Sequence, residues 1–490
     1  MTSDAPLRPR ARAPRGFQDR RADTIAAERR IVAAVSAVYE LHGFEAFDSG
    51  AFEYADALGK FLPDADRPNA GVFALRDDDE EWMALRYDLT APLARHVAEN
   101  LATLPKPFRR YAVGSVWRDE KAGPGRFREF IQCDADTVGS ARPEADAEII
   151  AMAVEGFAAA GLPRGGFVVR INNRKLLDGV LAGAGATDAG QKLAVLRAVD
   201  KLDRLGIRGV ADLLGAGRRD ESGAFTKGAM LDGPAVDAVV AFVEAGSGAR
   251  AATLDRLANV LGASREGDEG LSELAAIDAA LGALGVGEDA AIFDPSVVRG
   301  LEYYTGAVFE AELAGGSVDA GGEAIRFGSM GGGGRFDDLV ARFTGEKTPA
   351  TGFSFGVSRL AAALAARGGE TIRARGPVVV IAFDPARMAD YLGLAAELRA
   401  AGIAAEVYLG ASGMRAQMKY ADRRLSPAAV IMGEDEIASG EVTIKDLDLG
   451  RRLASQIEGN QAWRDERPGQ ITAPRTALVA TVRRIVDATR

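Results

Sequence analysis

The segment Phe108–Gly139 constrains the fold more than any other part of this sequence. Its two halves alternate in the manner of β-strands, and Gly123-Pro124-Gly125 between them is a strong turn signal. The segment therefore predicts two antiparallel strands joined by a loop. Because side chains alternate across a strand, Gln132, Asp134 and Asp136 should point to one face of the second strand.

The length of 490 residues exceeds what one hydrophobic core supports and predicts about two to four domains. Helical spacing of apolar residues over 182–284 indicates an inserted helical domain. After Pro377, strand-like and helix-like runs alternate, which predicts a small α/β domain with a mixed sheet. The division expected is a flexible leader at 1–14, a core at 15–181 and 286–367, a helical insertion at 182–285, the α/β domain at 377–459 and an extension of no assignable role at 460–490.

Two further segments give clear local predictions. Thr24–His42 predicts a long amphipathic helix, because apolar residues recur at helical spacing and Gly43 follows where a left-handed cap is wanted. Residues 291–313 and 328–360 predict strand, glycine loop, strand and helix in that order.

Composition excludes several kinds of site. The 47% hydrophobic and 27% charged residues are ordinary globular values. A lone cysteine, Cys133, excludes an internal disulfide and fits a reducing cytosol. His42 and His96 lie far apart, so a zinc site of the usual kind cannot be assembled. We expect no metal site built from side chains, and any metal should be Mg²⁺ carried with a nucleotide.

Charge and hydropathy narrow the range of possible binding partners. No apolar run approaches the roughly 20 residues of a membrane-spanning helix, so we expect a soluble, cytoplasmic protein without membrane contact. The net charge of −10 argues against indiscriminate binding to a phosphate backbone. Any nucleic acid should therefore meet a local basic surface.

The octamer Arg299–Gly306 reads Arg-Gly-Leu-Glu-Tyr-Tyr-Thr-Gly and precedes a strand-like run. Arginine offers a planar fork of donors for phosphate, tyrosines give flat walls with hydroxyl groups, and glycine lets backbone approach a ligand closely. Together these residues indicate a pocket for a small polar molecule that carries phosphate. A surface turn that leads into a strand is the alternative.

A second group of functional residues, Arg118, Glu120, Arg126 and Phe130, surrounds the predicted hairpin. Arginines neutralise the charge of a polyphosphate, and an aromatic ring can stack on a purine. This density favours a nucleotide site. The alternative is a solvated hairpin that carries charge pairs.

These segments resemble the class II aminoacyl-tRNA synthetases. Residues 108–139 look like the second signature motif of that class, and Thr351–Leu360 looks like the third. The octamer and the glycine run Gly331–Arg335 are similar to two segments peculiar to the histidyl-tRNA synthetase family, and 377–459 looks like its anticodon-binding domain. The resemblance spans about Arg15 to Arg452. It implies an α+β fold whose antiparallel-sheet catalytic domain is interrupted by the helical insertion, followed by an α/β anticodon-binding domain.

The resemblance also implies a function. The chain would activate L-histidine with ATP, accompanied by Mg²⁺, and transfer it to the 3′ end of tRNA-His as a homodimer. Arg299, placed against the α-phosphate, and Arg118 would be catalytic. The nucleotide-binding residues implied are Arg118, Glu120, Arg126, Phe130 and Arg359.

For histidine, the resemblance implies that Asp88 and Thr90 meet the amino group and that the second hairpin strand reads the other end. A carboxylate at Asp136 would fix the imidazole tautomer, whereas the alternative is a strand-end acid paired with an arginine. The residues implied for histidine are Asp88, Leu89, Thr90, Gln132, Asp136, Tyr303 and Tyr304.

The sequence departs from the family pattern at two places that concern partners. Asp48-Ser-Gly50 stands where the first class II motif normally has a proline at the dimer seam. Lys121–Pro124 stands where many bacterial members have Arg-Pro-Gln, in a loop that meets the acceptor end of tRNA. The sequence therefore leaves open whether the extra 5′ guanosine of tRNA-His is required.

Two non-catalytic relatives remain as alternatives. The regulatory subunit of ATP phosphoribosyltransferase shares this core and senses histidine, but such subunits usually lack the carboxyl-terminal domain and the arginines that this chain keeps. A stress-kinase-like module that senses uncharged tRNA is the other alternative, although no kinase glycine loop and lysine set is present.

Overall fold

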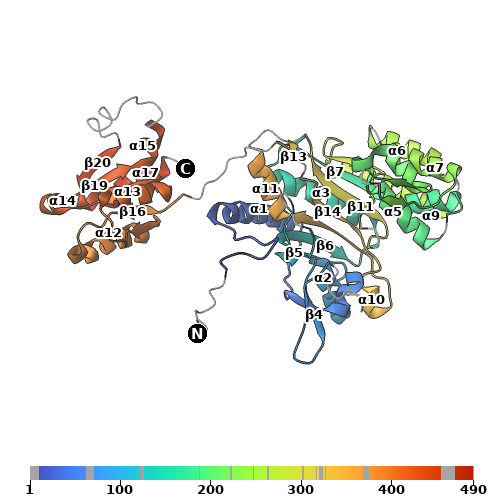
Figure 1. The fold of residues 1–490 in the computed structure, drawn as a ribbon, viewed down its shortest axis with the longest axis horizontal. Coiled ribbons are helices and arrows are strands. Elements are labelled where there is room, and N and C mark those ends of the chain that lie inside the picture. The colour runs from blue at the N-terminus through green and yellow to red at the C-terminus, as the bar shows by residue number, and fades with distance from the viewer. Residues whose placement is uncertain are drawn as a thin grey trace, which may run out of the picture. The chain divides into compact units, whose positions relative to one another are not determined.

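The computed structural model describes residues 10–61, 71–121, 123, 126–186, 188–220, 223–246, 248–261, 264–300, 303–315, 317–318, 324–325, 327–367, 375–453 and 469–488. The chain divides into two compact units, Met1–Thr371 and Ile372–Arg490, and each is described by itself (Figure 1). Parts of the predicted leader, hairpin loop, octamer and extension lie outside the described residues.

The first unit is built on an eight-stranded sheet in the order β1-β5-β6-β15-β14-β11-β7-β10. The two edge pairs are parallel and the inner neighbours are antiparallel, which confirms the predicted α+β class with an antiparallel core. The strands are β1 (Glu45–Ala46), β5 (Phe108–Trp117), β6 (Glu129–Val138), β15 (Ala350–Gly356), β14 (Ser329–Arg335), β11 (Ala307–Leu313), β7 (Phe167–Asn173) and β10 (Ala291–Phe293).

The predicted hairpin is confirmed in β5 and β6, whose pairing runs from Phe108 opposite Val138 to Trp117 opposite Glu129. On its other side β6 pairs with β15, where Gln132 lies opposite Gly356. The polar face of β6 therefore has neighbours on both sides, and those neighbours decide which of its side chains can meet a ligand.

Helices α1 (Ala22–Leu41), α3 (Pro143–Ala159) and α11 (Val357–Ala366) pack together on one face of this sheet (Figure 1). In α1, Ile31, Val35 and Tyr39 are buried at helical spacing. The helix ends before Gly43, which takes a left-handed conformation with φ of 77°. The predicted helix and its cap are thus confirmed.

The chain between β7 and β10 is mainly helical, as the spacing predicts, and its apolar residues join the same core as the central sheet. Asp188, Asp232 and Ser264 each accept a hydrogen bond from the first turn of a helix that follows them. A small hairpin, which the sequence pattern did not predict, lies among these helices. The elements are α4 (Arg174–Gly183), α5 (Ala189–Val199), α6 (Leu202–Leu214), β8 (Gly217–Arg219), β9 (Phe225–Lys227), α7 (Gly233–Glu244), α8 (Arg250–Leu261) and α9 (Arg265–Ala283).

A smaller three-stranded sheet, in the order β2-β4-β3, precedes helix α2 (Thr90–Glu99). One side of α2 is buried, and Leu93 and Val97 pack with Phe336 and Val340 from the loop after β14. This packing holds the start of α2 near the central sheet. The remaining elements are β2 (Phe52–Tyr54), η1 (Ala55–Phe61), β3 (Ala74–Arg76), β4 (Trp82–Leu85), β12 (Ser317–Val318), β13 (Ala324–Ile325) and α10 (Ala341–Thr344).

The predicted glycine loop is wrong, because residues 331–334 lie inside strand β14 and do not form a loop. A Cβ atom on Gly333 would lie 2.0 Å from the carbonyl oxygen of Gly352 on β15, and one on Gly331 would lie 2.7 Å from the ring of Phe353. The run is glycine because neighbouring strands and rings occupy the space of its side chains.

The second unit contains a five-stranded mixed sheet in the order β17-β16-β18-β19-β20, as predicted for a small α/β domain. Its interior is apolar and includes Val380, Leu394 and Val430. The elements are β16 (Val378–Val380), η2 (Pro385–Arg387), α12 (Met388–Ala400), β17 (Ala405–Val407), α13 (Met414–Arg423), β18 (Ala428–Ile431), α14 (Glu434–Ser439), β19 (Glu441–Asp446), α15 (Leu447–Leu453), β20 (Gln470–Pro474), η3 (Arg475–Ala477) and α17 (Leu478–Asp487).

The described part of the stretch 460–490 is integral to this second unit. β20 pairs with β19 at the edge of the sheet, and Leu478, Val482 and Ile485 of α17 are buried in the same core as β16 and β18. The sequence left the role of 460–490 open, and in the structure residues beyond 459 complete the sheet and the core of the small domain.

Candidate active site

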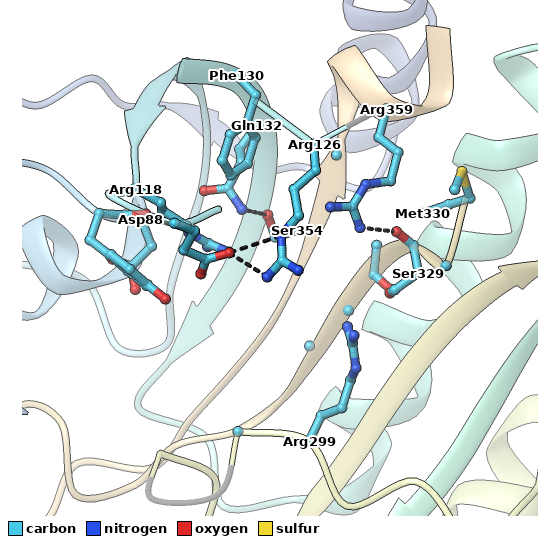
Figure 2. Close-up of a pocket in the computed structure, with 18 of the residues that line it drawn as sticks. Asp88, Arg118, Arg126, Phe130, Gln132, Arg299, Ser329, Met330, Ser354 and Arg359 are labelled. Carbon is cyan, nitrogen blue, oxygen red and sulfur yellow. Dashed lines mark hydrogen bonds and ion pairs between the residues drawn. The ribbon is translucent and has the colours of Figure 1, made fainter. Parts of the chain in front are cut away.

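A cavity of about 910 Å³ lies where the polar face of β6 meets β14, β15 and the start of α2 (Figure 2). This volume is near the upper end of the range for small-molecule sites. Leu89 and Asp136 are predicted site residues that do not line it. The others do line it, namely Asp88, Thr90, Arg118, Glu120, Arg126, Phe130, Gln132, Arg299, Tyr303, Tyr304 and Arg359.

Four guanidinium groups converge on this cavity from three separate parts of the chain, those of Arg118 and Arg126 in one hairpin, of Arg299 and of Arg359. Figure 2 shows the side chains of Arg126, Arg299 and Arg359 pointing into the same space. Burial lowers the pKa of Arg359, and the charges of the other three arginines lower it further. Like charges held this close indicate a site for a multiply charged anion.

Neighbouring acceptors fix the direction of three of these groups. Arg126 Nε donates to Glu120 at 3.0 Å, and Arg359 Nη1 donates to the carbonyl oxygen of Ser329 at 2.7 Å. Arg299 Nε lies 2.8 Å from Glu310 Oε1 on β11. Because a guanidinium carries several donors in a rigid plane, a hydrogen bond to one nitrogen restricts the directions in which the other donors can point.

Arg118 differs, since it lies between two aromatic rings. Its guanidinium carbon is 4.4 Å from the centroid of Tyr87 and 5.1 Å from that of Phe130, and its Nε donates to the carbonyl oxygen of Tyr87 at 3.2 Å. The stack places a cation beside the flat face of Phe130. This geometry suits an aromatic base that carries phosphates.

The start of α2 is organised by Asp88. Its Oδ1 accepts from the backbone N–H groups of Thr90 at 3.1 Å and Ala91 at 2.8 Å, so one carboxylate oxygen caps the helix. The side chain of Asp88 also lines the cavity. Leu89 instead packs with Ala112 and Val116, which explains why the leucine does not reach the cavity wall.

The residues on the polar face of β6 differ in whether they reach the cavity. Gln132 Nε2 donates to Ser354 Oγ at 2.7 Å, and both residues line the cavity, as does Asp134. Asp136 is 2.7 Å from Nη2 of Arg110, which is fully buried. The structure therefore places Asp136 in a buried ion pair beside the cavity, as in the alternative that the sequence offered.

The carboxyl groups of β6 are both strongly affected by burial. Burial, and then the charge of Asp136, raises the pKa of Asp134 to about 8. Burial also raises the pKa of Asp136, to about 6, although the positive charge of Arg110 opposes this rise. Asp134 is thus the less favourably paired acid of the two.

Tyr303 and Tyr304 form a second wall, and their rings meet edge to face with centroids 5.4 Å apart. Burial raises the pKa of both phenols, so both stay protonated near neutral pH. The turn before them needs Gly300, whose φ of 59° is left-handed. A Cβ on Gly334 would lie 2.8 Å from Tyr304, so the glycine strand makes room for this ring.

Sequence reasoning missed several lining residues. Asp134 was recognised only as a member of the polar face, and Ser354 and Asp200 were not considered. A pattern of alternation identifies Asp134, but no local signal marks Asp200, which follows α5 of the helical stretch. In the described part of the chain, no cluster of three or more His, Cys, Asp or Glu residues is placed to hold a metal ion.

Comparison with known proteins decides the family. A profile described as Histidyl-tRNA synthetase matches residues 16–360, and one described as Anticodon binding domain matches residues 377–459. The histidine--tRNA ligase of Caulobacter vibrioides is 70% identical over 493 residues, covering 99% of this chain and 100% of that protein. The chain belongs to the histidyl-tRNA synthetase family. It is an aminoacyl-tRNA synthetase, and therefore a ligase.

Other members of the histidyl-tRNA synthetase family support the same assignment. The histidine--tRNA ligase of Brucella suis biovar 1 is 53% identical over 488 residues, covering 98% of this chain and 96% of that protein. The crystal structure of histidyl-tRNA synthetase from Nostoc sp. PCC 7120 matches with a TM-score of 0.72 at 28% identity and covers 97% of this chain and 100% of its own. The predicted resemblance is confirmed, and the non-catalytic regulatory subunit is not favoured. Among the described residues, no helix is long and apolar enough to cross a membrane.

Proposed function

We propose that this chain activates L-histidine with ATP to form histidyl-adenylate and transfers the histidyl group to the 3′ end of tRNA-His. One observation carries the proposal. Four arginines from three separate segments converge on a cavity whose other walls offer carboxylate, amide and phenol groups. A polyanion and a small zwitterion would each find complementary charge there.

The nucleotide would occupy the arginine side of the cavity. Its adenine would stack on Phe130 beside Arg118, and Arg126 and Arg359 would hold the phosphates. Glu120 supports this arrangement because it orients Arg126. Mg²⁺ would enter with ATP and add positive charge to its phosphates.

The amino acid would lie against α2, β6 and the tyrosines. The ammonium group of histidine would meet Asp88 and Thr90, where the cap of α2 fixes the carboxylate. Gln132, Tyr303 and Tyr304 would line its other side. This orientation directs the carboxylate of histidine toward the arginines.

Adenylate formation needs alignment and positive charge, and no side chain has to remove a proton from histidine. An oxygen of the histidine carboxylate attacks the α-phosphorus, the new O–P bond forms, and the bond to pyrophosphate breaks. Both reactants are anions, so the attack is slow unless their charges are neutralised. Arg299, whose guanidinium is held by Glu310 at the cavity, would stabilise the charge on the α-phosphate oxygens.

Transfer to tRNA completes the proposed reaction. A ribose hydroxyl of the 3′ terminus attacks the carbonyl carbon of the adenylate, an ester forms, AMP leaves, and the hydroxyl proton passes to the phosphate of the departing AMP. The second unit would supply anticodon contacts, for which Arg415, Lys419 and Arg423 of α13 offer positive charge. We further propose that the protein works in the cytoplasm as a homodimer.

The test is histidine-dependent exchange of labelled pyrophosphate into ATP, followed by charging of tRNA-His. Exchange that requires histidine, together with charged tRNA, is expected. Exchange without histidine, or none at all, would contradict the proposal, since a histidine-sensing subunit binds the amino acid but forms no adenylate. Transcripts with and without the extra 5′ guanosine show whether that nucleotide is required.

A further inference from the structure

Three adjacent strands, β5, β6 and β15, lie side by side around Asp134, and residues of β6 and β15 line the cavity beside Gln132. In their register, Asp134 of β6 lies between Ala112 of β5 and Ser354 of β15. Ser354 is small and lines the cavity together with Asp134, whereas Ala112 packs against Leu89. The next residue on the same face, Asp136, lies opposite Arg110, whose long side chain crosses the strand and reaches the carbonyl oxygen of Leu89 at 2.8 Å.

Two acceptor oxygens on the polar face of β6 lack donors. Asp134 Oδ1 and Gln132 Oε1 are buried and accept no hydrogen bond from the residues that the structure describes. Both side chains line the cavity, with 2% of Asp134 and 8% of Gln132 exposed. Because buried polar atoms in folded proteins are nearly always paired, this pair of oxygens indicates a ligand that donates N–H groups.

We propose that Asp134 is a specificity-determining residue that accepts a hydrogen bond from the imidazole ring of histidine. The inference rests on the proposed function, since histidine is the substrate named there. It assigns to Asp134 a contact that sequence resemblance assigned to Asp136.

Position along β6 favours the ring over the ammonium group as the donor. Phe130, the proposed platform for adenine, lies four residues before Asp134 in the sequence. Because a strand rises about 3.3 Å per residue, Asp134 is roughly 13 Å further along the strand, with Gln132 midway. The carboxylate of histidine must reach the α-phosphate, so its side chain extends away from the nucleotide and toward Asp134.

The charges around Asp134 agree with such a role. Burial and the charge of Asp136 raise its pKa, so the ionised form lacks sufficient compensation in the protein alone. The hydroxyl group of Ser354 hydrogen-bonds the Asp134 carboxyl group, but Oδ1 of Asp134 still has no donor among the described residues, and a ring N–H would supply one. A competing amino acid without a ring donor would leave the buried oxygen unpaired, and the site would reject it.

The experiment uses the full-length chain and pyrophosphate exchange with histidine and with its two ring N-methylated forms, each of which lacks one ring N–H. For Asp134→Asn and Asp134→Ala we expect the KM for histidine to rise by about tenfold or more, with the KM for ATP changed by less than about twofold. The preference for histidine over the methylated form that removes the bonded N–H should fall by a similar factor. The Asn variant keeps the shape of the side chain if the Ala variant does not fold.

Two control variants test whether the change in substrate preference is specific to Asp134. Asp146→Asn removes an equally buried carboxylate, one that pairs with Arg335 at 2.6 Å and does not line the cavity, so the preference should not move. Asp136→Asn tests the neighbouring acid. The inference is overturned if the preference falls in Asp136→Asn while Asp134→Asn retains it, or if histidine and its methylated forms lose activity equally in the Asp134 variants.

The same assay separates this inference from the proposed function. If the unaltered chain shows no histidine-dependent exchange, the proposed function fails and the inference fails with it. If the unaltered chain is active and the Asp134 variants keep the KM for histidine, only the inference fails.

Discussion

Arg299 and Glu310 form an ion pair across the cavity wall, with Nε of the arginine 2.8 Å from Oε1 of the glutamate. The arginine side chain is 46% exposed whereas the glutamate side chain is 11% exposed. Burial raises the pKa of Glu310, and the charge of Arg299 opposes that rise. The glutamate is therefore the more buried partner, and its carboxylate sets the direction of the more exposed guanidinium.

Replacing Glu310 with glutamine should slow activation more than it weakens binding. The amide keeps the shape of the side chain but loses the charge that orients Arg299. A displaced guanidinium stabilises the negative charge of the transition state less well, and this loss affects the transition state more than the bound substrates. We expect kcat for pyrophosphate exchange to fall by about tenfold to a hundredfold while the KM for histidine changes little.

Glu312→Gln is the matched control for this variant. Glu312 lies two residues further along β11 and pairs with Arg170 at 3.1 Å, outside the cavity lining. A similar loss of kcat in both variants would show that the strand, and not the orientation of Arg299, is responsible.

Removing Arg299 itself should have a larger effect on activity and a small one on stability. We expect Arg299→Ala to reduce kcat for activation by about 10²–10³, as for other groups that stabilise transition-state charge. Because the side chain is half exposed, the unfolding free energy should change by no more than about 0.5 kcal/mol. Exchange kinetics and thermal melts measure the two quantities, with Arg265→Ala, an exposed arginine on α9, as the control. Near-normal turnover of Arg299→Ala contradicts the assigned role.

The acids of β6 predict how stability depends on pH. The pKa of Asp134 rises from 3.8 to about 8 on folding, so the folded chain binds this proton more tightly than the unfolded chain. Its contribution to stability is full below the unfolded pKa and is lost as the pH rises toward 8, by at most about 1.4 kcal/mol per pH unit. Asp136, Asp88 and Arg110 share this environment and affect the size of the change.

The measurement compares thermal unfolding of the unaltered chain and Asp134→Asn in the absence of ligands. The melting temperature of the variant should exceed that of the unaltered chain by an amount that widens from pH 5 to about 8 and then levels off. A constant difference over this range would mean that Asp134 is already ionised at low pH in the folded chain.

Local patterns predicted the parts of the fold that depend on neighbouring residues. Alternation and the turn signal predicted β5 and β6, and helical spacing with Gly43 predicted α1. The strands and the helix are encoded within short segments, so the sequence reveals them. That Arg118, Arg299 and Arg359 meet at one site was implied by the family resemblance and by no local pattern, and all three line one cavity.

Contacts between distant segments could not be predicted in this way. Alternation places Asp134 and Asp136 on one face of β6, but it cannot say which of them meets a long arginine. The answer depends on the register of β5, which sets Arg110 opposite Asp136 and Ala112 opposite Asp134. Asp200 reaches the cavity from the helical stretch for a similar reason, since its position follows from how that stretch packs.

The glycine strand β14 gives a final prediction, because its residues were expected in a loop and are instead enclosed by neighbours. A methyl group on Gly333 would lie 2.0 Å from the carbonyl oxygen of Gly352 and 2.8 Å from Cα of Phe353. Moving the backbone of a central sheet costs free energy because it disturbs the hydrogen bonds to both neighbouring strands. We therefore expect Gly333→Ala to destabilise the first unit by more than about 4 kcal/mol or to prevent folding.

Gly282→Ala provides the comparison, since Gly282 lies in helix α9 with no atom within 4 Å of an added Cβ. That substitution should raise stability by about 0.5–1 kcal/mol, because alanine favours a helix. Soluble yield and thermal melts of the full chain measure both changes. A Gly333→Ala protein that melts like the unaltered chain would mean that β14 does not pack against β15 in this register, and the packing of Tyr304 against Gly334 of β14 would then have to be revised.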